Sequence, residues 1–350
     1  MDTKVILLEE NNLEEELINQ AGEILQKGGL VAFPTETVYG LGADATNPEA
    51  VKKIFEAKGR PQDNPLIIHV ASFDNLEEYV TEISILAKKI MNKFWPGPLT
   101  IILNKSDKIP AITSAGLNSV GVRMPSNIIA RKLIAAAGVP IAAPSANISG
   151  RPSPTEVQRC IEDLMGKVDC ILGGGKCEVG LESTIIDCSV DPPCILRPGA
   201  ITLDMLKELD TRIYIDPAIM KKPEKDFKPK APGMKYRHYA PKAPLKIVQG
   251  DLQKTIAKIN EIVQNYMDDK KLVGIIATEE SKNSYAQGIV KSIGSRNDMD
   301  TVAQNLFEVL RSFDDISVDV ILAEAFEEKG IGIAVMNRLK KSAGYDITKV

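Results

Sequence analysis

Apolar residues recur near the start of the chain at the spacing of a helix. Leu17, Ile18, Ala21 and Leu25 fall on one helical face. The glycine pair directly after this segment ends such a helix, because glycine adopts the left-handed conformation common at helix C-termini. The next four residues, LVAF, are all apolar and predict a short buried strand.

Segments of these two kinds alternate up to about residue 209. Helices are predicted at residues 47–59, 83–94, 127–138, 154–166 and 202–209. Strands are predicted at residues 30–33, 64–70, 99–103, 119–124, 139–143, 170–172, 183–188 and 194–199. Asn47 and Pro48 support the helix that they begin, because asparagine caps helix N-termini and proline fits the first helical position. Strands and helices joined by short loops indicate an α/β fold, or an α+β fold with some antiparallel pairing.

This alternation stops at residues 216–244, which contain six prolines. Proline interrupts helices and central strands, so we expect a semi-extended linker there. After the linker, strands are predicted at 245–250, 272–278, 288–294 and 318–325, and helices at 252–267, 300–313 and 332–344. The sequence therefore predicts a first α/β domain at 1–215, a linker at 216–244 and a smaller Rossmann-like domain at 245–350.

The charge of the chain is distributed unevenly. The formal net charge is −4, but residues 217–244 hold eight Lys or Arg and two acidic residues, so the rest of the chain carries −10. A basic segment in an acidic protein favours an anionic ligand close to that segment. The acidity of the remainder argues against a nucleic-acid-binding protein, which usually has a large basic face.

Several classes of protein and site are disfavoured by what the sequence lacks. The longest apolar candidate, LIAAAGVPIAAP, is too short to span a bilayer and contains Pro140, and the acidic N-terminus has no signal-peptide core, so we expect no membrane association and a cytoplasmic location. The five cysteines form no C-x-x-C pair, which disfavours a disulfide framework and a zinc site. GGGKC lacks the first glycine of a P-loop, GLGADA is a poor dinucleotide-binding motif, and no G-x-S-x-G or H-E-x-x-H occurs.

Polar residues follow several of the apolar segments. They are Lys58 and Arg60 after a helix, His69 and Arg123 at strand ends, and the stretches PTETVYGLG (34–42) and PSANISGRPS (144–153). Taken singly, each has an ordinary structural interpretation, such as a helix cap, a core histidine or a turn. Taken together, cations, hydroxyls and an amide at strand ends suit a phosphate beside an α-amino acid or a ribose. Their spacing does not identify the ligand.

The ordered set of motifs resembles the threonylcarbamoyl-AMP synthase family, whose catalytic domain is the YrdC-like domain. The matching stretches are PTETVYGLG, the K-x-R pattern before NPLIIHV, GVRMP, the S-x-N pattern in PSANISGRPSPT, ESTIID and ILRPG. The linker APGMKYRHYAP and the domain after it are similar to the long, two-domain form of the family. The resemblance covers nearly the whole chain and implies a YrdC-like twisted mixed sheet with helices in the first domain.

The resemblance implies a nucleotidyltransferase that joins L-threonine, bicarbonate and ATP, with Mg²⁺ on the ATP, into threonylcarbamoyl-adenylate and releases pyrophosphate. Separate transfer proteins would then form N6-threonylcarbamoyladenosine in tRNA, and this protein would contact tRNA at most weakly. The residues implied around threonine are Thr37, His69, Arg123, Ala143 and Ser183. Those implied around ATP are Arg60, Asn64, Ser119, Ser145, Asn147, Ser153, Arg197 and His238. Lys58 and Arg60 are the implied catalytic cations.

Physical expectations follow from these implied roles. The glycines of PTETVYGLG would let the backbone approach the substrate, and Arg123 would hold the threonine carboxylate as a two-pronged donor. Lys58 and Arg60 would neutralise a carbamate and an α-phosphate that repel each other. His69 is expected either to accept the proton of the amine or to orient the substrate. The basic linker is expected to close over the reactive product as a lid.

Two other functions stay open at this point. One is a module that binds double-stranded RNA or tRNA by shape and phosphate contacts, without catalysis. The other is a carbamoyl-transfer domain of a larger maturation factor, although the sequence lacks zinc-finger cysteine pairs and an acylphosphatase-like segment.

Overall fold

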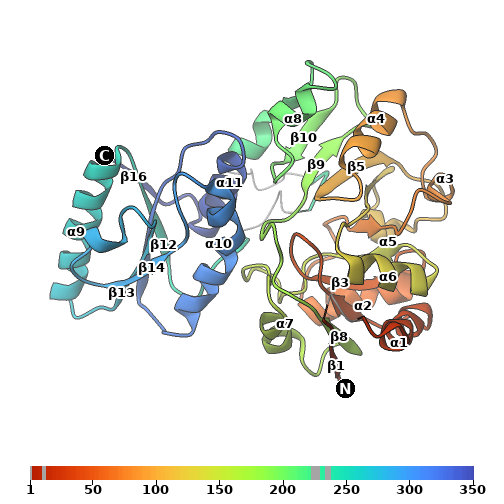
Figure 1. Cartoon of the computed structure of the whole chain (residues 1–350), viewed down its shortest axis with the longest axis horizontal. Helices are drawn as coiled ribbons and strands as arrows, with labels where there is room; N and C mark the ends of the chain where they lie inside the picture. The colour runs from red at the N-terminus through yellow and green to blue at the C-terminus, as the bar shows by residue number, and fades with distance from the viewer. Residues whose placement is uncertain (1, 10–12, 222–228, 233–237) are drawn as a thin grey trace. The chain divides into compact units, whose positions relative to one another are not determined.

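The computed structural model describes residues 2–9, 13–221, 229–232 and 238–350 of the chain (Figure 1). Two compact units divide it. The N-terminal unit comprises residues 1–149 and 153–236, and the C-terminal unit comprises residues 150–152 and 237–350. No helix in the described residues is long and apolar enough to cross a membrane.

The described part of the N-terminal unit contains an 11-stranded mixed sheet with the order β1-β8-β2-β3-β7-β4-β6-β5-β9-β10-β11. Its strands are β1 Lys4–Leu7, β2 Val31–Phe33, β3 Gly40–Asp44, β4 Ile67–His69, β5 Leu99–Asn104, β6 Ser119–Arg123, β7 Ile141–Ala142, β8 Cys170–Gly173, β9 Thr184–Asp187, β10 Cys194–Arg197 and β11 Tyr214–Ile215. β4 and β6 are parallel, whereas β7 runs antiparallel to β4 and β5 runs antiparallel to β6. The predicted mixed α/β fold is therefore confirmed.

Six helices in the described part of this unit lie close to where the sequence predicted them, and three short ones, at residues 76–79, 111–114 and 217–220, were not predicted. The helices are α1 Glu15–Gln26, α2 Pro48–Lys58, α3 Leu76–Tyr79, α4 Ile85–Phe94, α5 Ala111–Ser114, α6 Ile128–Ala137, α7 Val157–Leu164, α8 Leu203–Lys207 and the 3₁₀ helix η1 Pro217–Met220. The Asn47 side chain caps α2 by accepting hydrogen bonds from the backbone amides of Glu49 and Ala50. Gly59 ends α2 in the left-handed conformation, with φ of 61°, which a side chain disfavours.

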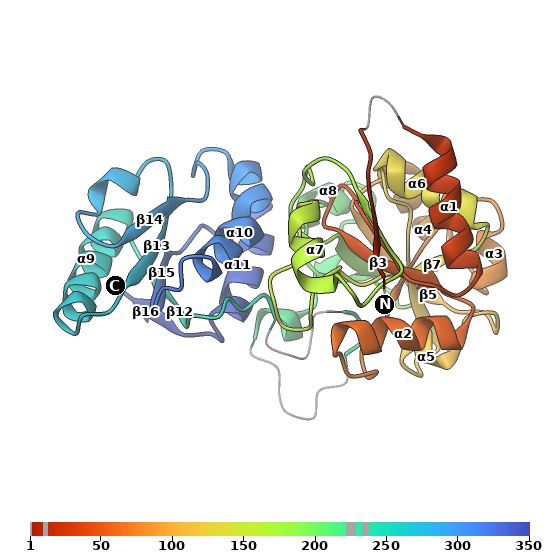
Figure 2. The same cartoon turned by 90° about the horizontal axis from the view of Figure 1, so that it is seen from below.

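The two faces of this sheet are covered differently. One face packs against α2, α4, α7 and α8 through buried side chains such as Ile54, Ile90, Leu164 and Leu206. On the other face, α1 and α6 cover the strands of the β1 half, and these two helices lie side by side in Figure 2. The strands of the β10 half are covered on that face by Ile219 and Ala231, from the proline-rich segment. Polar residues of the sheet lie on this second face, between the two coverings.

The glycines of PTETVYGLG have a packing role that the sequence did not predict. Gly40 and Gly42 lie in β3, an antiparallel partner of β2 that the sequence did not predict. A Cβ on Gly42 would lie 2.7 Å from a methyl of Ile141 and 2.9 Å from the ring of Phe33. These glycines therefore allow close packing inside the protein, between the strand and its neighbours.

The C-terminal unit has a parallel sheet of five described strands in the order β14-β13-β15-β12-β16. Its elements are β12 Leu245–Gln249, α9 Leu252–Asp268, β13 Val273–Ala277, η2 Lys282–Ser284, β14 Ile289–Ser292, α10 Met299–Asp314, β15 Val320–Glu324, α11 Gly332–Ser342 and β16 Ile347–Lys349. α9 lies on one side of the sheet, and α10 and α11 lie on the other (Figure 2). This doubly wound parallel arrangement confirms the predicted Rossmann-like architecture.

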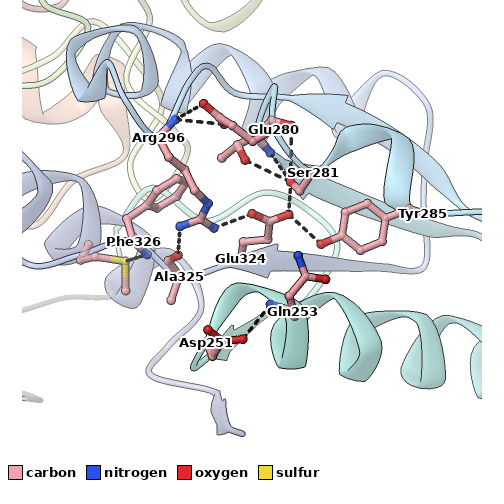
Figure 3. A network of polar contacts seen from close by, with 11 residues as sticks. Asp251, Gln253, Glu280, Ser281, Tyr285, Arg296, Glu324, Ala325 and Phe326 are labelled. Carbon is pink, nitrogen blue, oxygen red and sulfur yellow. Dashed lines mark hydrogen bonds and ion pairs between the residues drawn. The ribbon is translucent and has the colours of Figure 1, made fainter.

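A polar network lies at the carboxyl ends of the strands in this unit (Figure 3). Glu324 ends β15 and is fully buried. Its Oε1 accepts hydrogen bonds from Ser281 and from the hydroxyl of Tyr285, the latter at 2.6 Å, and its Oε2 pairs with Nη2 of Arg296 at 2.5 Å. Burial, followed by the neighbouring Glu324 carboxylate, raises the pKa of Tyr285. The network joins the ends of three strands, so we interpret it as structural.

Glu324→Ala is expected to lower the free energy of unfolding of the C-terminal unit by about 3 kcal/mol, because it leaves buried donors and a cation without their acceptor. Glu324→Gln keeps one acceptor and should cost less. Glu279→Ala, which removes an exposed ion pair with Lys282, should change stability by less than about 0.5 kcal/mol. Hydrogen exchange of β13 and β15 measures the effect, and unchanged protection in Glu324→Ala would contradict this interpretation.

Candidate active site

The candidate site begins where β4 and β6 end on the second face of the N-terminal sheet. His69 and Arg123 are the last residues of these parallel strands and are register partners. Thr100 of β5 is the register partner of Arg123 on its other side. All three side chains are buried. Because neighbouring residues in register point to the same face of a sheet, three polar groups meet at this point.

The stretch between β2 and β3 brings two hydroxyls and a carboxylate to Arg123. Nη1 of Arg123 donates to Oγ1 of Thr37 at 2.9 Å, and Nη2 lies 2.7 Å from Oε1 of Glu36. Thr35 fixes the turn, because its Oγ1 donates to the carbonyl of Val38 at 2.6 Å and accepts from the amide of Thr37 at 3.2 Å. We call Thr35, Glu36, Thr37, His69 and Arg123 the Arg123 cluster.

His69 is neutral in this cluster at neutral pH. Burial, and then the nearby Arg123, lower the pKa of His69 to about 3. Nδ1 lies 3.3 Å from the carbonyl oxygen of Ile141, which can only accept, so Nδ1 carries the proton and Nε2 carries the lone pair. The ring also contacts Phe33 edge-on. A group with so low a pKa is a poor acceptor for the proton of an amine, which favours the orienting role over that of a base.

The low pKa of His69 predicts a pH dependence of stability. The folded state resists protonation of the ring, whereas the unfolded chain binds a proton below pH 6.5, so stability is lost as the pH falls below that value. Between pH 7.5 and 5, we expect the wild type to lose about 2 kcal/mol more than His69→Gln does. Urea unfolding of both proteins across this range measures the difference, and parallel curves would contradict the buried, neutral histidine.

A second polar group adjoins the Arg123 cluster through Thr100. The hydroxyls of Thr100 and Ser183 lie 2.7 Å apart. Arg197, the last residue of β10, donates from Nε to the carbonyl of Ser183 at 3.0 Å and from Nη2 to its hydroxyl at 3.1 Å. Ser153 donates to Oε1 of the buried Glu182 at 2.7 Å. The structure therefore brings Ser183, Arg197 and Arg123 to one region of the sheet.

Lys58 connects the K-x-R turn to the S-x-N loop. Its side chain is buried, and its ammonium group donates to the backbone carbonyls of Ser145 and Asn147. The amide of Ser149 donates in return to the carbonyl of Lys58 at 2.9 Å. Ser145 also donates to the side chain of Asn147. Lys58 therefore fixes the loop that carries two of the implied ATP contacts, besides supplying a positive charge.

Asn64 and Ser119 lie further from the Arg123 cluster. Asn64 is fully buried, and within the described part of the chain neither its amide oxygen nor its nitrogen has a hydrogen-bond partner. Such an amide is what a polar ligand would satisfy. Ser119 starts β6, about 13 Å along the strand from Arg123. It lines a small cavity with Ile67, Thr100, Gly121, Lys230 and Pro232, among others.

The other implied contacts are placed as follows. Ala143 directly follows β7, and its amide donates to the carbonyl of Ile67 at 2.9 Å, so its backbone lies beside β4. Arg60 is half-buried after the end of α2, and its amide donates to the carbonyl of Phe55 at 2.9 Å. His238 belongs to the C-terminal unit, where its ring lies against Tyr239. Residues 233–237 of the predicted lid lie outside the described residues.

Sequence reasoning missed several residues of the site. Glu36 and Thr35 stand in a stretch that it singled out, but only Thr37 was assigned a role. Thr100 was hidden in an apolar strand, and Glu182 is the first residue of the matching stretch ESTIID, of which only Ser183 was assigned a role. The charge of Glu36 in a segment that is otherwise buried was the one signal that could have revealed it.

Comparison with known proteins decides the family of the chain. A family model described as Telomere recombination matches residues 23–199, and one described as Threonylcarbamoyl-AMP synthase, C-terminal domain, matches residues 201–344. A threonylcarbamoyl-AMP synthase of Pyrococcus abyssi is 49% identical over 346 residues, which cover 99% of either chain. The chain belongs to the threonylcarbamoyl-AMP synthase family.

Solved and shorter members of the threonylcarbamoyl-AMP synthase family extend this comparison. The crystal structure of P. abyssi Sua5 complexed with L-threonine matches with a TM-score of 0.94 and 48% identity, covering 99% of this chain and 100% of that one. A threonylcarbamoyl-AMP synthase of Vibrio campbellii is 34% identical over 182 residues, which cover 97% of that protein and 51% of this chain. Family membership replaces the alternative of an RNA-binding module without catalysis.

Proposed function

We propose that this protein condenses L-threonine, bicarbonate and ATP into threonylcarbamoyl-AMP, with release of pyrophosphate and water. The supporting observation is the buried Arg123 cluster, in a chain that shares 48% identity with a protein crystallised with L-threonine. An oxygen of the carbamate group on the threonine nitrogen would attack the α-phosphate of ATP, while the α-carboxylate of threonine stays free. The bond from the α-phosphorus to the bridging oxygen would break, and pyrophosphate would leave with the electron pair.

The Arg123 cluster and its neighbours would bind threonine. The Arg123 guanidinium would hold the carboxylate, and the lone pair on Nε2 of His69 would accept a hydrogen bond from the substrate hydroxyl. Thr37, Ser183 and the backbone of Ala143 would complete this end of the site. The nucleotide would extend along β6 towards Ser119, where Ile67 and Ile102 of the small cavity offer apolar surface for the base.

Charge neutralisation would be the main catalytic task. Threonine carbamate and the α-phosphate are both anions, so fixed cations are needed to bring them into line. Arg60 would contact the phosphates, and Lys58 would hold Ser145 and Asn147 of the S-x-N loop against them. Asn64, Ser153, Arg197 and His238 complete the set of ATP contacts that we propose.

Mg²⁺ would arrive with ATP, because this ion is usually bound by substrate phosphates and only one or two carboxylates. The described residues contain no group of three or more potential metal ligands. They do place the buried Glu182 carboxylate on Ser153, a proposed ATP contact. Glu182 is the residue that we propose to hold the ion, which would withdraw charge from the phosphate oxygens.

The proline-rich segment would be a lid as well as a linker between domains at 1–215 and 245–350. Ile219 and Ala231 are buried in a cluster with Ile67 and Ile102, on the sheet face that carries Ser119. The product is a mixed anhydride that water destroys, so covering it would protect it.

Two truncations test the lid. A chain ending at Asp216 is expected to keep a folded first domain and lose most of its activity, whereas a chain ending at Ala243 should retain more. The V. campbellii relative matches only 51% of this chain but over 97% of its own length, which indicates that a first domain can fold alone. Steady-state pyrophosphate release measures both truncations after circular dichroism shows that they are folded. Equal activity would leave the segment as a passive tether.

The proposed activity is tested by leaving out one substrate at a time. Pyrophosphate release from ATP should require L-threonine and bicarbonate together, in the presence of Mg²⁺. Equal turnover without threonine, or none with all substrates, would remove the proposal. The adenylate would then pass to separate threonylcarbamoyl-transfer proteins in the cytoplasm, with at most a weak contact between this protein and tRNA.

A further inference from the structure

Glu36 is a buried carboxylate that the roles proposed so far do not use. Its side chain is 4% exposed, and Oε1 lies 2.7 Å from Nη2 of Arg123. Oε2 has no hydrogen-bond partner among the residues that the structure describes. Nε of Arg123 likewise lacks an acceptor in the described residues. The ion pair therefore leaves one anionic acceptor and one cationic donor without hydrogen-bond partners.

An unsatisfied atom in a buried ion pair needs an explanation. Leaving a buried charged group without its full set of partners is costly, and two buried charges are often no more stable than apolar residues of the same size. Other groups in the Arg123 cluster do not supply the missing donor to Oε2. His69 is neutral and its Nδ1 proton is directed at Ile141, while the Thr35 hydroxyl donates to Val38. A ligand that carries a cation is the partner that fits.

We propose that Glu36 binds the α-ammonium group of the amino acid substrate while Arg123 binds its carboxylate. This inference rests on the proposed function and adds the group that recognises the amine. A free α-amino acid is a zwitterion, so its two charges match the unsatisfied donor and acceptor of the pair. Because the substrate and the pair are each neutral overall, binding buries no net charge. Glu36 is thereby a specificity residue for a free amino acid.

The buried thiol of Cys177 near Glu36 supplies no negative charge to this region. The thiol lies against the backbone of Thr35, and burial raises its pKa well above the usual value, so it remains uncharged. The ammonium group would therefore find its counter-charge on Glu36. The simpler alternative is that Glu36 only aligns Arg123 for the carboxylate, in which case any carboxylate ligand would depend on Glu36 equally.

Calorimetric titration of the full chain with three ligands separates these two roles. L-threonine carries both charges, 3-hydroxybutanoate lacks the ammonium group, and L-threoninol lacks the carboxylate. Glu36→Gln is expected to weaken the binding of threonine and threoninol by about ten- to a hundredfold. The dissociation constant of 3-hydroxybutanoate should change by less than about threefold. Arg123→Gln, the matched control, should weaken the binding of threonine and 3-hydroxybutanoate and leave the binding of threoninol unchanged. Glu36→Asp, which keeps the charge, should still prefer threonine to 3-hydroxybutanoate.

Each contrary result has a distinct meaning. If Glu36→Gln weakened the binding of threonine and of 3-hydroxybutanoate equally, the inference would be overturned, and Glu36 would be a group that only aligns Arg123. Unchanged threonine binding in Glu36→Gln would also overturn it. If wild-type protein bound none of the three ligands, the proposed function itself would fail, and this inference with it. Tryptophan fluorescence from Trp95, the single tryptophan of the chain, verifies that each variant is folded.

Discussion

Replacing Arg123 with alanine is expected to raise the KM for L-threonine by about ten- to a hundredfold, while the KM for ATP changes by less than about threefold. The guanidinium is buried and charged, and it is the group of the cluster suited to a carboxylate. The substitution also leaves Glu36 buried without its counter-ion, so the free energy of unfolding should fall by about 3 kcal/mol. Pyrophosphate release at varied threonine and varied ATP, together with urea unfolding, measures both effects.

Arg60→Ala is the matched control for Arg123→Ala. Arg60 is half-buried and follows Lys58 by two residues. Its loss should raise the KM for ATP and lower kcat, while the KM for threonine stays unchanged. The assignment of the two cations to different substrates is wrong if both variants shift the two KM values alike.

Lys58→Met is expected to lower kcat/KM for ATP by about a hundredfold or more, which corresponds to about 3 kcal/mol of transition-state stabilisation. Methionine fills a similar volume but has no ammonium group to hold the carbonyls of Ser145 and Asn147. The loss therefore combines a missing cation with a loosened S-x-N loop. Lys58→Arg keeps the charge and should recover part of the activity, although its planar group fits the two carbonyls differently.

Lys52→Met provides the control for Lys58→Met on the same helix. Lys52 is exposed, with an ion pair to Glu56 at 3.9 Å, so its loss should leave kcat/KM within about twofold. A folded Lys58→Met protein with wild-type kinetics for ATP would contradict the role that we propose for Lys58.

Local patterns were sufficient to predict most helices. Asn47, Pro48 and Gly59 mark both ends of α2 in the sequence, and the structure places them as cap, first residue and left-handed terminator. These predictions hold because a helix is stabilised by hydrogen bonds between residues close in sequence. The strands β2, β4, β5 and β6 were also predicted, because each is a short apolar run that the sheet buries.

The sequence did not predict β1, β3 and β16, which form only through distant partners. β1 pairs with β8, whose residues lie 166 positions later in the chain. β3 contains two glycines, which normally disfavour a strand, and it forms because Phe33 and Ile141 leave no room for side chains there. β16, at the C-terminal end, pairs with β12. In each case the interaction that creates the strand is absent from its local sequence.

The site shows the same division between local and distant interactions. Motifs placed His69 and Arg123 at strand ends, and the structure shows them as register partners. The contact of Lys58 with two carbonyls could not be predicted, because it joins backbone atoms 87 and 89 residues away. The pairing of Glu36 with Arg123 likewise spans distant segments and required the fold.

The most direct test of the proposed synthase activity is the fate of labelled bicarbonate. The protein is incubated with ATP, Mg²⁺, L-threonine and ¹³C-bicarbonate, and the nucleotide products are analysed by mass spectrometry. We expect an adenylate that carries both threonine and one ¹³C atom, and that disappears when threonine is omitted. Hydrolysis of ATP without any labelled threonine–AMP adduct would contradict the proposed activity.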